Sequence, residues 1–500
     1  MKPAADQDMK QNRTRSLAGG RRKTRADGTF SYKGHQKSSR PPLKSGRLSF
    51  IKLPAIPVLA FAVFAATTAL TGGSSRLDIV WLLILRPITI LCLMAMFLTA
   101  KRIPWGDIRP IPLLFAAFAI TIAMQLVALP PAVWQHIPGR EQYNAVALAL
   151  NGGDQWHPLT LTPDRTWNSL ISLLVPFTAM VGFLLLNDRQ RRALLLPILG
   201  LVAFSMLLGV AQFAGGETSS LYWYSVSGRG QLIGLLANRN HQGALLALTL
   251  PLLRVWVLQA NHSARKLRGS IGLGAASLIV IYVLVLGSRA GMALAIVGLV
   301  GAFMVDPSLE ASRQISKRQR LIIISSIAVG VIVLFAMTLN ADRAVSIARL
   351  VQRDDILKTE PRIQALPTLF HIMAQTFPFG TGFGSFVPVY TSFEPDSLLG
   401  PTYFNNAHND LIELIITGGL PAVFVFAVFL GWWGRASYRC FMASPTPAIQ
   451  QQRATAWAIL ILLLASLVDY PLRTPILGTL FTIFACWLAA SPNSTEENPA

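Results

Sequence analysis

NNAHNDLIELIITGGLPAVFVFAVFLGWW, residues 405–433, changes within a few positions from amides, a histidine and acids to an almost unbroken apolar run. The run is long enough to cross a bilayer as a helix, which takes about 20 apolar residues. Lipid penalises each unsatisfied polar group by several kcal/mol, so polar side chains at such an entrance need partners or a function. Those at this entrance are Asn405, Asn406, His408, Asn409, Asp410 and Glu413.

The composition indicates a polytopic membrane protein rather than a soluble domain. Of the 500 residues, 52% are hydrophobic and only 13% are charged, which exceeds the apolar content of ordinary globular proteins. Cys92, Cys440 and Cys486 are scattered, with no CxxC spacing and no companion histidines. We therefore expect neither a disulfide framework nor a metal site.

The net charge of +21 is spread unevenly along the chain. Residues 1–52 carry 14 Lys and Arg against 3 acidic residues, with few large apolar side chains. This segment is predicted to be a disordered basic cytoplasmic tail beside the membrane. Nucleic-acid binding is the alternative for such a tail, but an apolar segment follows at once, so we expect membrane lipids and no nucleic acid as its partner.

Apolar windows of membrane-spanning length predict an all-α polytopic membrane protein with about 12 transmembrane helices. We assign nine of these helices to residues 53–339, a large periplasmic loop to 340–410, three more helices to 411–490, and a short cytoplasmic tail to 491–500. The windows lie near 54–71, 78–99, 111–129, 169–186, 192–213, 241–260, 271–287, 290–306, 321–339, 411–433, 454–468 and 475–490.

Basic residues orient this topology. With the tail in the cytoplasm, every other predicted cytoplasmic loop carries a Lys/Arg cluster, and thirty of the 44 Lys and Arg fall on that side. This asymmetry is typical of membrane proteins, and it places both termini in the cytoplasm. In a bacterium the membrane would be the inner (cytoplasmic) membrane and the opposite face the periplasm.

From Arg229 onward, the cations on the predicted periplasmic side are all arginines except Lys358. A single arginine at a helix end usually snorkels or caps carbonyl groups. However, the planar guanidinium also holds phosphate oxygens bidentately, so a group of arginines indicates a phosphate-bearing ligand. The arginines concerned are Arg229, Arg239, Arg289, Arg343, Arg349, Arg353, Arg362 and Arg473.

The predicted periplasmic loop ends in two motifs. FPFGTGFGSF, residues 377–386, lacks the spacing and the preceding strand of a dinucleotide-binding fingerprint, so it predicts a tight turn anchored by aromatic side chains. NNAHND then opens the next helix, where unpaired N–H groups and the positive end of the dipole favour anions. Asn406 or Asn409 can cap this helix.

His408 has two interpretations. Alone, a histidine at this position is most often a capping or interfacial residue. Beside the external arginines it becomes a candidate general base, because neutral imidazole can take a proton from a sugar hydroxyl near neutral pH. Asp410 and Glu413 can orient His408, or they can simply suit the positive helix end.

Six stretches in order along the chain resemble the O-antigen ligase superfamily, which also includes O-antigen and exopolysaccharide polymerases and some protein O-oligosaccharyltransferases. The similarity spans roughly residues 110–480, and the His-Asn pair followed by a glycine is its most specific element. The stretches are LVALPPAVWQHIPGR, GRGQLIGLLANRNHQGALLAL, LGSRAG, FPFGTGFGSF, NNAHNDLIELIITGGLPAV and SLVDYPLRTP.

The resemblance implies a GT-C-like integral membrane glycosyltransferase whose site faces the periplasm. Such enzymes move a glycan from undecaprenyl pyrophosphate to an acceptor hydroxyl, here on lipid A–core or on a growing glycan, without cofactor or metal. It implies that His408 activates the acceptor and that Arg289 and Arg362 bind pyrophosphate. The family-like blocks also contain Arg229, Asn240, His241, Asp469 and Arg473, of which the last two fit polymerase-like members better than ligases.

These observations predict a metal-independent, inverting glycosyl transfer in lipopolysaccharide or surface polysaccharide biosynthesis. The growing charge on the leaving pyrophosphate would be stabilised by arginines, and His408 would remove the acceptor proton. Ligase and polymerase differ only in the acceptor, so both remain open. A polysaccharide-lipid transporter or flippase is the alternative from another class, since it also needs many spans and arginines for pyrophosphate.

Overall fold

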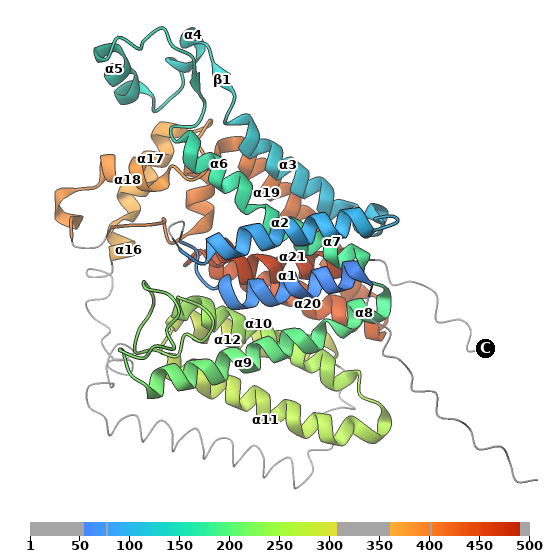
Figure 1. Cartoon of the computed structure of the whole chain (residues 1–500). Helices are drawn as coiled ribbons and strands as arrows, with labels where there is room; N and C mark the ends of the chain where they lie inside the picture. Colours follow the sequence, from blue (N-terminus) through green and yellow to red (C-terminus); the bar gives the residue numbers. More distant parts are fainter. Residues whose placement is uncertain (1–54, 77–78, 308–360, 401–402, 491–500) are drawn as a thin grey trace, which may run out of the picture. The chain divides into compact units, whose positions relative to one another are not determined.

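The computed structural model describes residues 55–76, 79–307, 361–400 and 403–490 (Figure 1). The predicted basic tail 1–52, the ninth predicted span near 321–339, the first part of the loop 340–410, and the tail 491–500 lie outside these residues.

Helices dominate the described chain. Its first half contains α1 (Ile56–Thr71), α2 (Leu82–Thr99), η1 (Trp105–Ile108), α3 (Pro110–Met124), β1 (Ala128–Leu129), α4 (Pro131–Trp134), α5 (Glu141–Ala149), β2 (His157–Pro158), α6 (Pro163–Ser172), α7 (Leu174–Leu185), α8 (Asp188–Ala193), α9 (Leu195–Ala214) and α10 (Arg239–Leu258). Its second half contains α11 (His262–Leu286), α12 (Arg289–Val305), α16 (Pro361–Gln364), α17 (Leu366–Thr376), α18 (Phe386–Phe393), η4 (Asp396–Leu398), α19 (Asp410–Met442), α20 (Pro447–Ser466), η5 (Pro471–Arg473) and α21 (Pro475–Ala489).

Six segments of the described chain are helical, long and apolar enough to cross a membrane: α2, α6 with α7, α8 with α9, α10, α11 and α19. Shorter apolar helices include α1, α3, α12 and α21. Each predicted window other than the one near 321–339 overlaps a described helix. The prediction of a polytopic helical membrane protein is therefore confirmed in its class, while the number of about 12 crossings and the periplasmic loop stay predictions.

A short β-ribbon is an exception to the all-α prediction. β1 pairs antiparallel with β2, with Ala128 opposite Pro158 and Leu129 opposite His157. The segment between the two strands, which includes α4 and α5, has no apolar run of spanning length, so the sequence analysis assigned it no structure. Arg140 at its centre is fully buried and donates hydrogen bonds to the carbonyl groups of Leu159 (2.6 Å) and Gly380 (3.0 Å).

Helix α10 lies at the centre of the main core and packs against α9, α11, α12 and α20 (Figure 1). Its contact with α12 is close because both helices carry glycine there: a Cβ at Gly243 would lie 2.8 Å from Cα of Gly291. Small residues allow helix backbones to approach in this way in membrane proteins. As a result, the first turns of α10 and α12 are neighbours.

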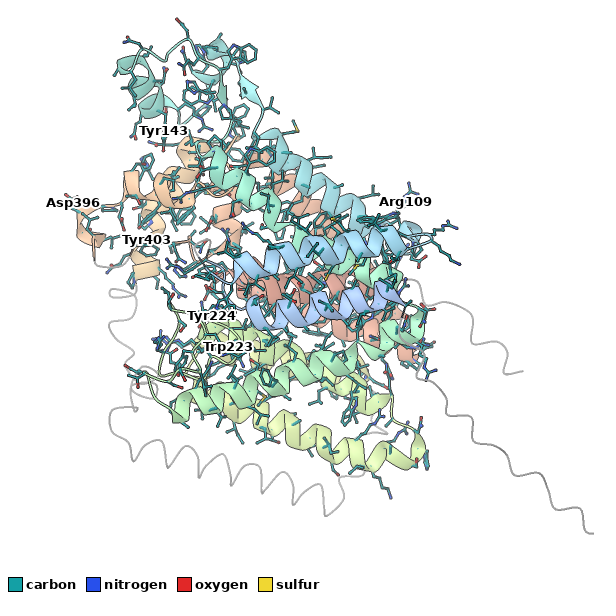
Figure 2. All side chains as sticks on the ribbon, in the orientation of Figure 1. Arg109, Tyr143, Trp223, Tyr224, Asp396 and Tyr403 are labelled. Carbon is teal, nitrogen blue, oxygen red and sulfur yellow. The ribbon has the colours of Figure 1, made fainter. Side chains whose placement is uncertain are left out.

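The connection between α1 and α2 fixes where α10 and α21 begin. Gly73 donates its N–H to the hydroxyl of Tyr224 (2.7 Å) and accepts from the N–H of Ala237 (2.9 Å). Gly72 accepts from the N–H of Ile476 at 3.0 Å. Trp223 and Tyr224, marked in Figure 2, belong to the loop between α9 and α10. This loop and the start of α21 are therefore held against the same turn.

The glycine-rich stretch 377–386 forms the predicted tight turn, and the turn docks on α19. Gly419 interrupts α19 with φ 59° and ψ −158°. The kink frees the carbonyl groups of Ile416 and Thr417, which accept the N–H groups of Thr381 and Gly382, both at 2.9 Å. The turn thus supplies the hydrogen bonds that the interrupted helix lacks.

We expect Gly380→Ala to destabilise the protein because Gly380 has φ 75° and a Cβ there would lie 2.7 Å from the backbone nitrogen of Gly419. A side chain in this conformation costs roughly 1–3 kcal/mol. The measurement is the melting temperature of the purified protein in detergent micelles. Gly431→Ala is the matched control, because Gly431 lies within α19 with open space around it. A melting temperature for Gly380→Ala equal to that of the control would contradict the docking described here.

Candidate functional site

The polar entrance to the predicted membrane helix folds as a turn followed by the first turn of α19. His408 adopts a left-handed conformation with φ 52°. Asn409 is the N-cap, and its side chain accepts the N–H groups of Leu411 (3.0 Å) and Ile412 (3.1 Å). The same side chain donates to the carbonyl group of Leu467 at 2.9 Å. The cap therefore also ties the start of α19 to the end of α20.

Arg473, at the end of η5, holds this turn in place. Its guanidinium contacts Glu413 at 2.6 Å, Asp410 at 3.0 Å and the side-chain oxygen of Asn406 at 3.0 Å. The second oxygen of Glu413 accepts the N–H of Ala407 at 2.8 Å. Burial alone lowers the pKa of Arg473, but the carboxylates of Glu413 and Asp410 outweigh it and raise this pKa above its ordinary value. Both acids thus serve the scaffold at the positive end of α19.

Asp469 supplies the carboxylate that faces His408. It lies between α20 and η5 and is 1% exposed. One of its oxygens, Oδ2, accepts hydrogen bonds from the side chains of Asn238 (3.1 Å) and Asn240 (2.7 Å). The other, Oδ1, accepts the N–H of Tyr470 at 3.0 Å.

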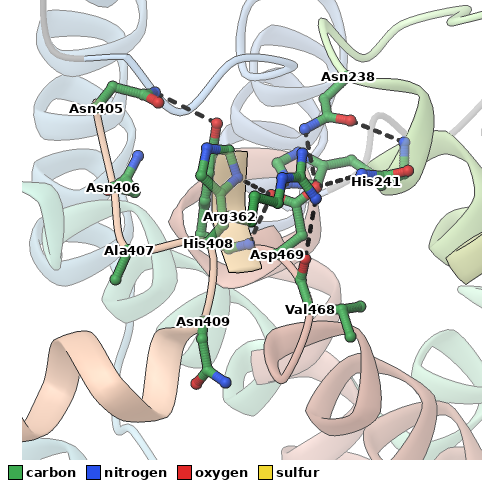
Figure 3. Close-up of polar contacts among 12 residues, drawn as sticks. Asn238, His241, Arg362, Asn405, Asn406, Ala407, His408, Asn409, Val468 and Asp469 are labelled. Atoms are coloured by element: carbon green, nitrogen blue, oxygen red, sulfur yellow. Dashed lines mark hydrogen bonds and ion pairs between the residues drawn. The ribbon is translucent and has the colours of Figure 1, made fainter. Parts of the chain in front are cut away.

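Two imidazole rings approach Oδ1 of Asp469 from different elements (Figure 3). Nδ1 of His408 lies 3.5 Å from this oxygen, and Nε2 of His241, on α10, lies 3.7 Å from it. Burial alone raises the pKa of Asp469, but hydrogen bonding to His241 and His408 outweighs it and holds this pKa well below its usual range. The carboxylate is therefore ionised at neutral pH.

Aromatic side chains enclose the histidines. The ring of His408 lies between Phe404, 5.9 Å away edge to face, and Tyr470, 5.0 Å away. Tyr470 also meets the ring of His241 edge to face at 5.4 Å. The side chain of Asn405 donates to the hydroxyl group of Tyr470 at 3.3 Å. These contacts fix both rings in orientation.

Arg362 on α16 contacts the segment that contains Asp469, and Arg289 begins α12 next to the site. Arg362 donates to the carbonyl group of Val468 at 3.2 Å (Figure 3), and its charge contributes to the lowered pKa of Asp469. Arg289 is the first residue of α12 and follows Ser288, whose hydroxyl group donates to Asn240 at 2.8 Å. Arg362 thus lies beside Asp469, and Arg289 lies one residue from its hydrogen-bond network.

Arg229 is placed differently. Its guanidinium donates to the carbonyl group of Glu217 at 3.2 Å and lies 5.8 Å from the ring centre of Tyr222. These partners belong to the same loop between α9 and α10, so Arg229 packs on its own loop. Neither contact links Arg229 to Asp469.

Asn238, Tyr470 and Thr474 also belong to the site, although they were not predicted from the sequence. Asn238 is the N-cap of α10 and holds Asp469, Tyr470 packs between the histidines, and Thr474 contacts Nδ1 of His241 at 3.0 Å. A helix-capping signal at Asn238, before the apolar run of α10, is present in the sequence. For Tyr470 and Thr474, the only signal in the sequence was that they lie close to Asp469 in the chain.

Residues 274–427 match the family model described as O-antigen ligase, so this part of the chain is similar to that family. No curated protein matches the chain. The matched range includes Arg289, Arg362 and His408. The fold brings further residues to the same site from outside this range: Asn240, His241, Asp469 and Arg473.

We expect Arg473→Met to destabilise the protein, because it leaves the nearly buried carboxylate of Glu413 (2% exposed side chain) without its cation. Arg473 is itself partly exposed, so we expect a loss of about 2 kcal/mol in the free energy of unfolding, below the range for a fully buried pair. The measurement is denaturant-induced unfolding in detergent micelles. In the double variant with Glu413→Gln the carboxylate is gone, and part of the stability should return. Equal losses in the single and double variants would show that the ion pair is not the cause.

Proposed function

We propose that this protein is an O-antigen ligase-like glycosyltransferase that moves a glycan from undecaprenyl pyrophosphate to an acceptor sugar hydroxyl on the periplasmic side of the bacterial inner membrane. The observation that carries the proposal is the pairing of His408, which lies in the matched range at the start of a membrane-length helix, with the buried carboxylate of Asp469. A carboxylate behind a histidine fixes the ring and stabilises the imidazolium that forms on proton uptake.

In this mechanism one ring nitrogen of His408 acts as the base. Nδ1 faces Oδ1 of Asp469 at 3.5 Å, so the proton of the neutral ring is placed on Nδ1, toward the carboxylate. Nε2 then holds the lone pair and acts as the base. It takes the proton of the acceptor hydroxyl while the acceptor oxygen forms a bond to the anomeric carbon. The bond from that carbon to the pyrophosphate oxygen breaks, the electron pair leaves with the pyrophosphate, and attack from the opposite side inverts the anomeric centre.

Positive groups for the leaving pyrophosphate gather at the same place. The starts of α10 and α12 are linked by the hydrogen bond from Ser288 to Asn240, and the start of α19 is linked through Asn409 to Leu467, close to Asp469. Helix N-termini favour anions. Arg362 and Arg289 lie beside these helix starts, and guanidinium groups bind phosphate oxygens bidentately. Arg473 is the scaffold cation, so the pyrophosphate role falls to Arg362 and Arg289.

The acceptor distinguishes two enzymes with the same site. A ligase transfers to lipid A–core, whereas an O-antigen or exopolysaccharide polymerase transfers to the growing lipid-linked chain. A transporter or flippase would use buried polar groups along its path to the opposite face. Here the histidines, Asp469 and the paired acids cluster at the first turns of α10 and α19 and in the segment between α20 and α21, which favours a site for chemistry at one end of the helices.

We expect His408→Ala to abolish glycan transfer by a folded, membrane-inserted protein, because a positioned base contributes roughly 10²–10⁴-fold to the rate. The measurement is transfer in proteoliposomes with a lipid-linked glycan donor. His371→Ala is the matched control, since His371 lies exposed on α17 and contacts Gln375 and Phe393. Transfer at the wild-type rate by His408→Ala, with normal membrane insertion, would contradict the proposal.

Deleting the gene identifies the acceptor. Long polymer stranded on undecaprenyl pyrophosphate is expected for a missing ligase, and single lipid-linked repeat units are expected for a missing polymerase. The measurement is chromatography and mass spectrometry of the lipid-linked glycans. Complementation with the wild-type chain and with His408→Ala separates loss of activity from loss of the protein. A lipid-linked pool and a surface polysaccharide unchanged by the deletion would contradict both enzymes.

A further inference from the structure

His241 is a second imidazole on the carboxylate that His408 uses, and the proposed reaction gives it no role. It is 2% exposed and lies on α10, far from His408 in the sequence. Its Nε2 atom and Nδ1 of His408 are both buried, and both face Oδ1 of Asp469, at 3.7 and 3.5 Å. Both distances exceed those of an optimal hydrogen bond, as expected when two donors share one oxygen atom.

The surroundings of His241 define its protonation. Because an ionised carboxylate only accepts hydrogen bonds, Nε2 of His241 must carry a proton. Nδ1 lies 3.0 Å from the hydroxyl group of Thr474, which donates to it when the ring is neutral. Neutral His241 is therefore paired with Thr474 at Nδ1 and directs the N–H of Nε2 toward Asp469 at 3.7 Å.

We propose that His241 is a positioning residue that competes with His408 for Oδ1 of Asp469 and so keeps His408 in its neutral, proton-accepting form near neutral pH. A carboxylate held by one imidazole alone stabilises the imidazolium strongly. A second donor on the same oxygen weakens that attraction. The catalytic importance of this competition rests on the proposed function, whereas the competition itself does not.

Other charged and titratable groups face the pair from each neighbouring element. Arg362 on α16 acts on Asp469 and on Tyr470, and Asp410 on α19 acts on Asp469. Glu413 and Asp410 are joined to Arg473 in the scaffold cluster. These groups stay unchanged when His241 is substituted, so a change in the titration of His408 then reports on the shared oxygen.

The test follows proton uptake by His408 without any glycan. Diethyl pyrocarbonate acylates neutral imidazole, so the rate of His408 modification, followed by peptide mass spectrometry in the purified full-length protein, falls as the ring takes up a proton. We expect His241→Phe, which keeps a ring against Tyr470 but removes the donor, to raise the midpoint of this pH profile by about one unit. His241→Gln retains an N–H donor and should restore most of the wild-type midpoint.

Two controls locate the effect. Modification of His371 in the same samples should be the same in all variants. In a background of Asp469→Asn, where the shared charge is absent, His241→Phe should leave the His408 midpoint unchanged. A midpoint in His241→Phe that equals or falls below the wild-type value overturns the proposal, as does a shift that persists without the Asp469 carboxylate.

The transfer assay then separates this proposal from the proposed function. If the protein is a transferase, the acid side of its pH–rate profile should move up in His241→Phe by the same amount as the modification midpoint. A shifted midpoint with an unshifted pH–rate profile overturns the catalytic role of His241. A shifted midpoint in a protein that transfers no glycan supports the competition and counts against the function alone.

Discussion

The buried negative charge of Asp469 is the constraint on which the site depends. Moving a carboxylate out of water costs several kcal/mol, and the cost is recovered only if donors occupy its lone pairs. Two asparagine side chains, a backbone N–H and two imidazoles point at it. These donors come from α10, from the turn before α19, and from the segment that contains Asp469 itself. The carboxylate can therefore stay ionised only when these elements are assembled, so this buried charge and the local tertiary structure depend on each other.

The charges of the site divide into two groups with different tasks. Arg473 pairs with both Asp410 and Glu413, and these contacts fix the turn that holds His408 in its left-handed conformation. Asp469 is left with neutral donors and with Arg362 nearby, so its charge remains available to an imidazolium. Because the scaffold cation has its own two acids, it does not compete with His408 for Asp469.

Local signals in the sequence predicted part of this arrangement. The apolar windows within the described residues, the capping amide at Asn409 and the glycine turn are properties of short stretches, and each matches the structure. The β-ribbon and buried Arg140 were missed because the segment between α3 and α6 has neither spanning length nor a clear period. The partner of Asp410 and Glu413 was also missed, since an electrostatic pair between positions some 60 residues apart leaves no mark on either stretch alone.

The pairing of Asp469 with His408 was missed for the same reason, because the two residues are far apart in the sequence. From the sequence, Asp410 and Glu413 were the carboxylates that could orient His408, or they could simply suit the positive helix end. However, the N-cap at Asn409 starts the helix between them, and Asp410 enters the first turn of α19, where Arg473 takes it. A histidine placed one residue before a helix cap is thereby separated from the acids of that helix, and it must find its carboxylate on another element. The segment after α20, tied to the same cap through Leu467, brings Asp469 to that position.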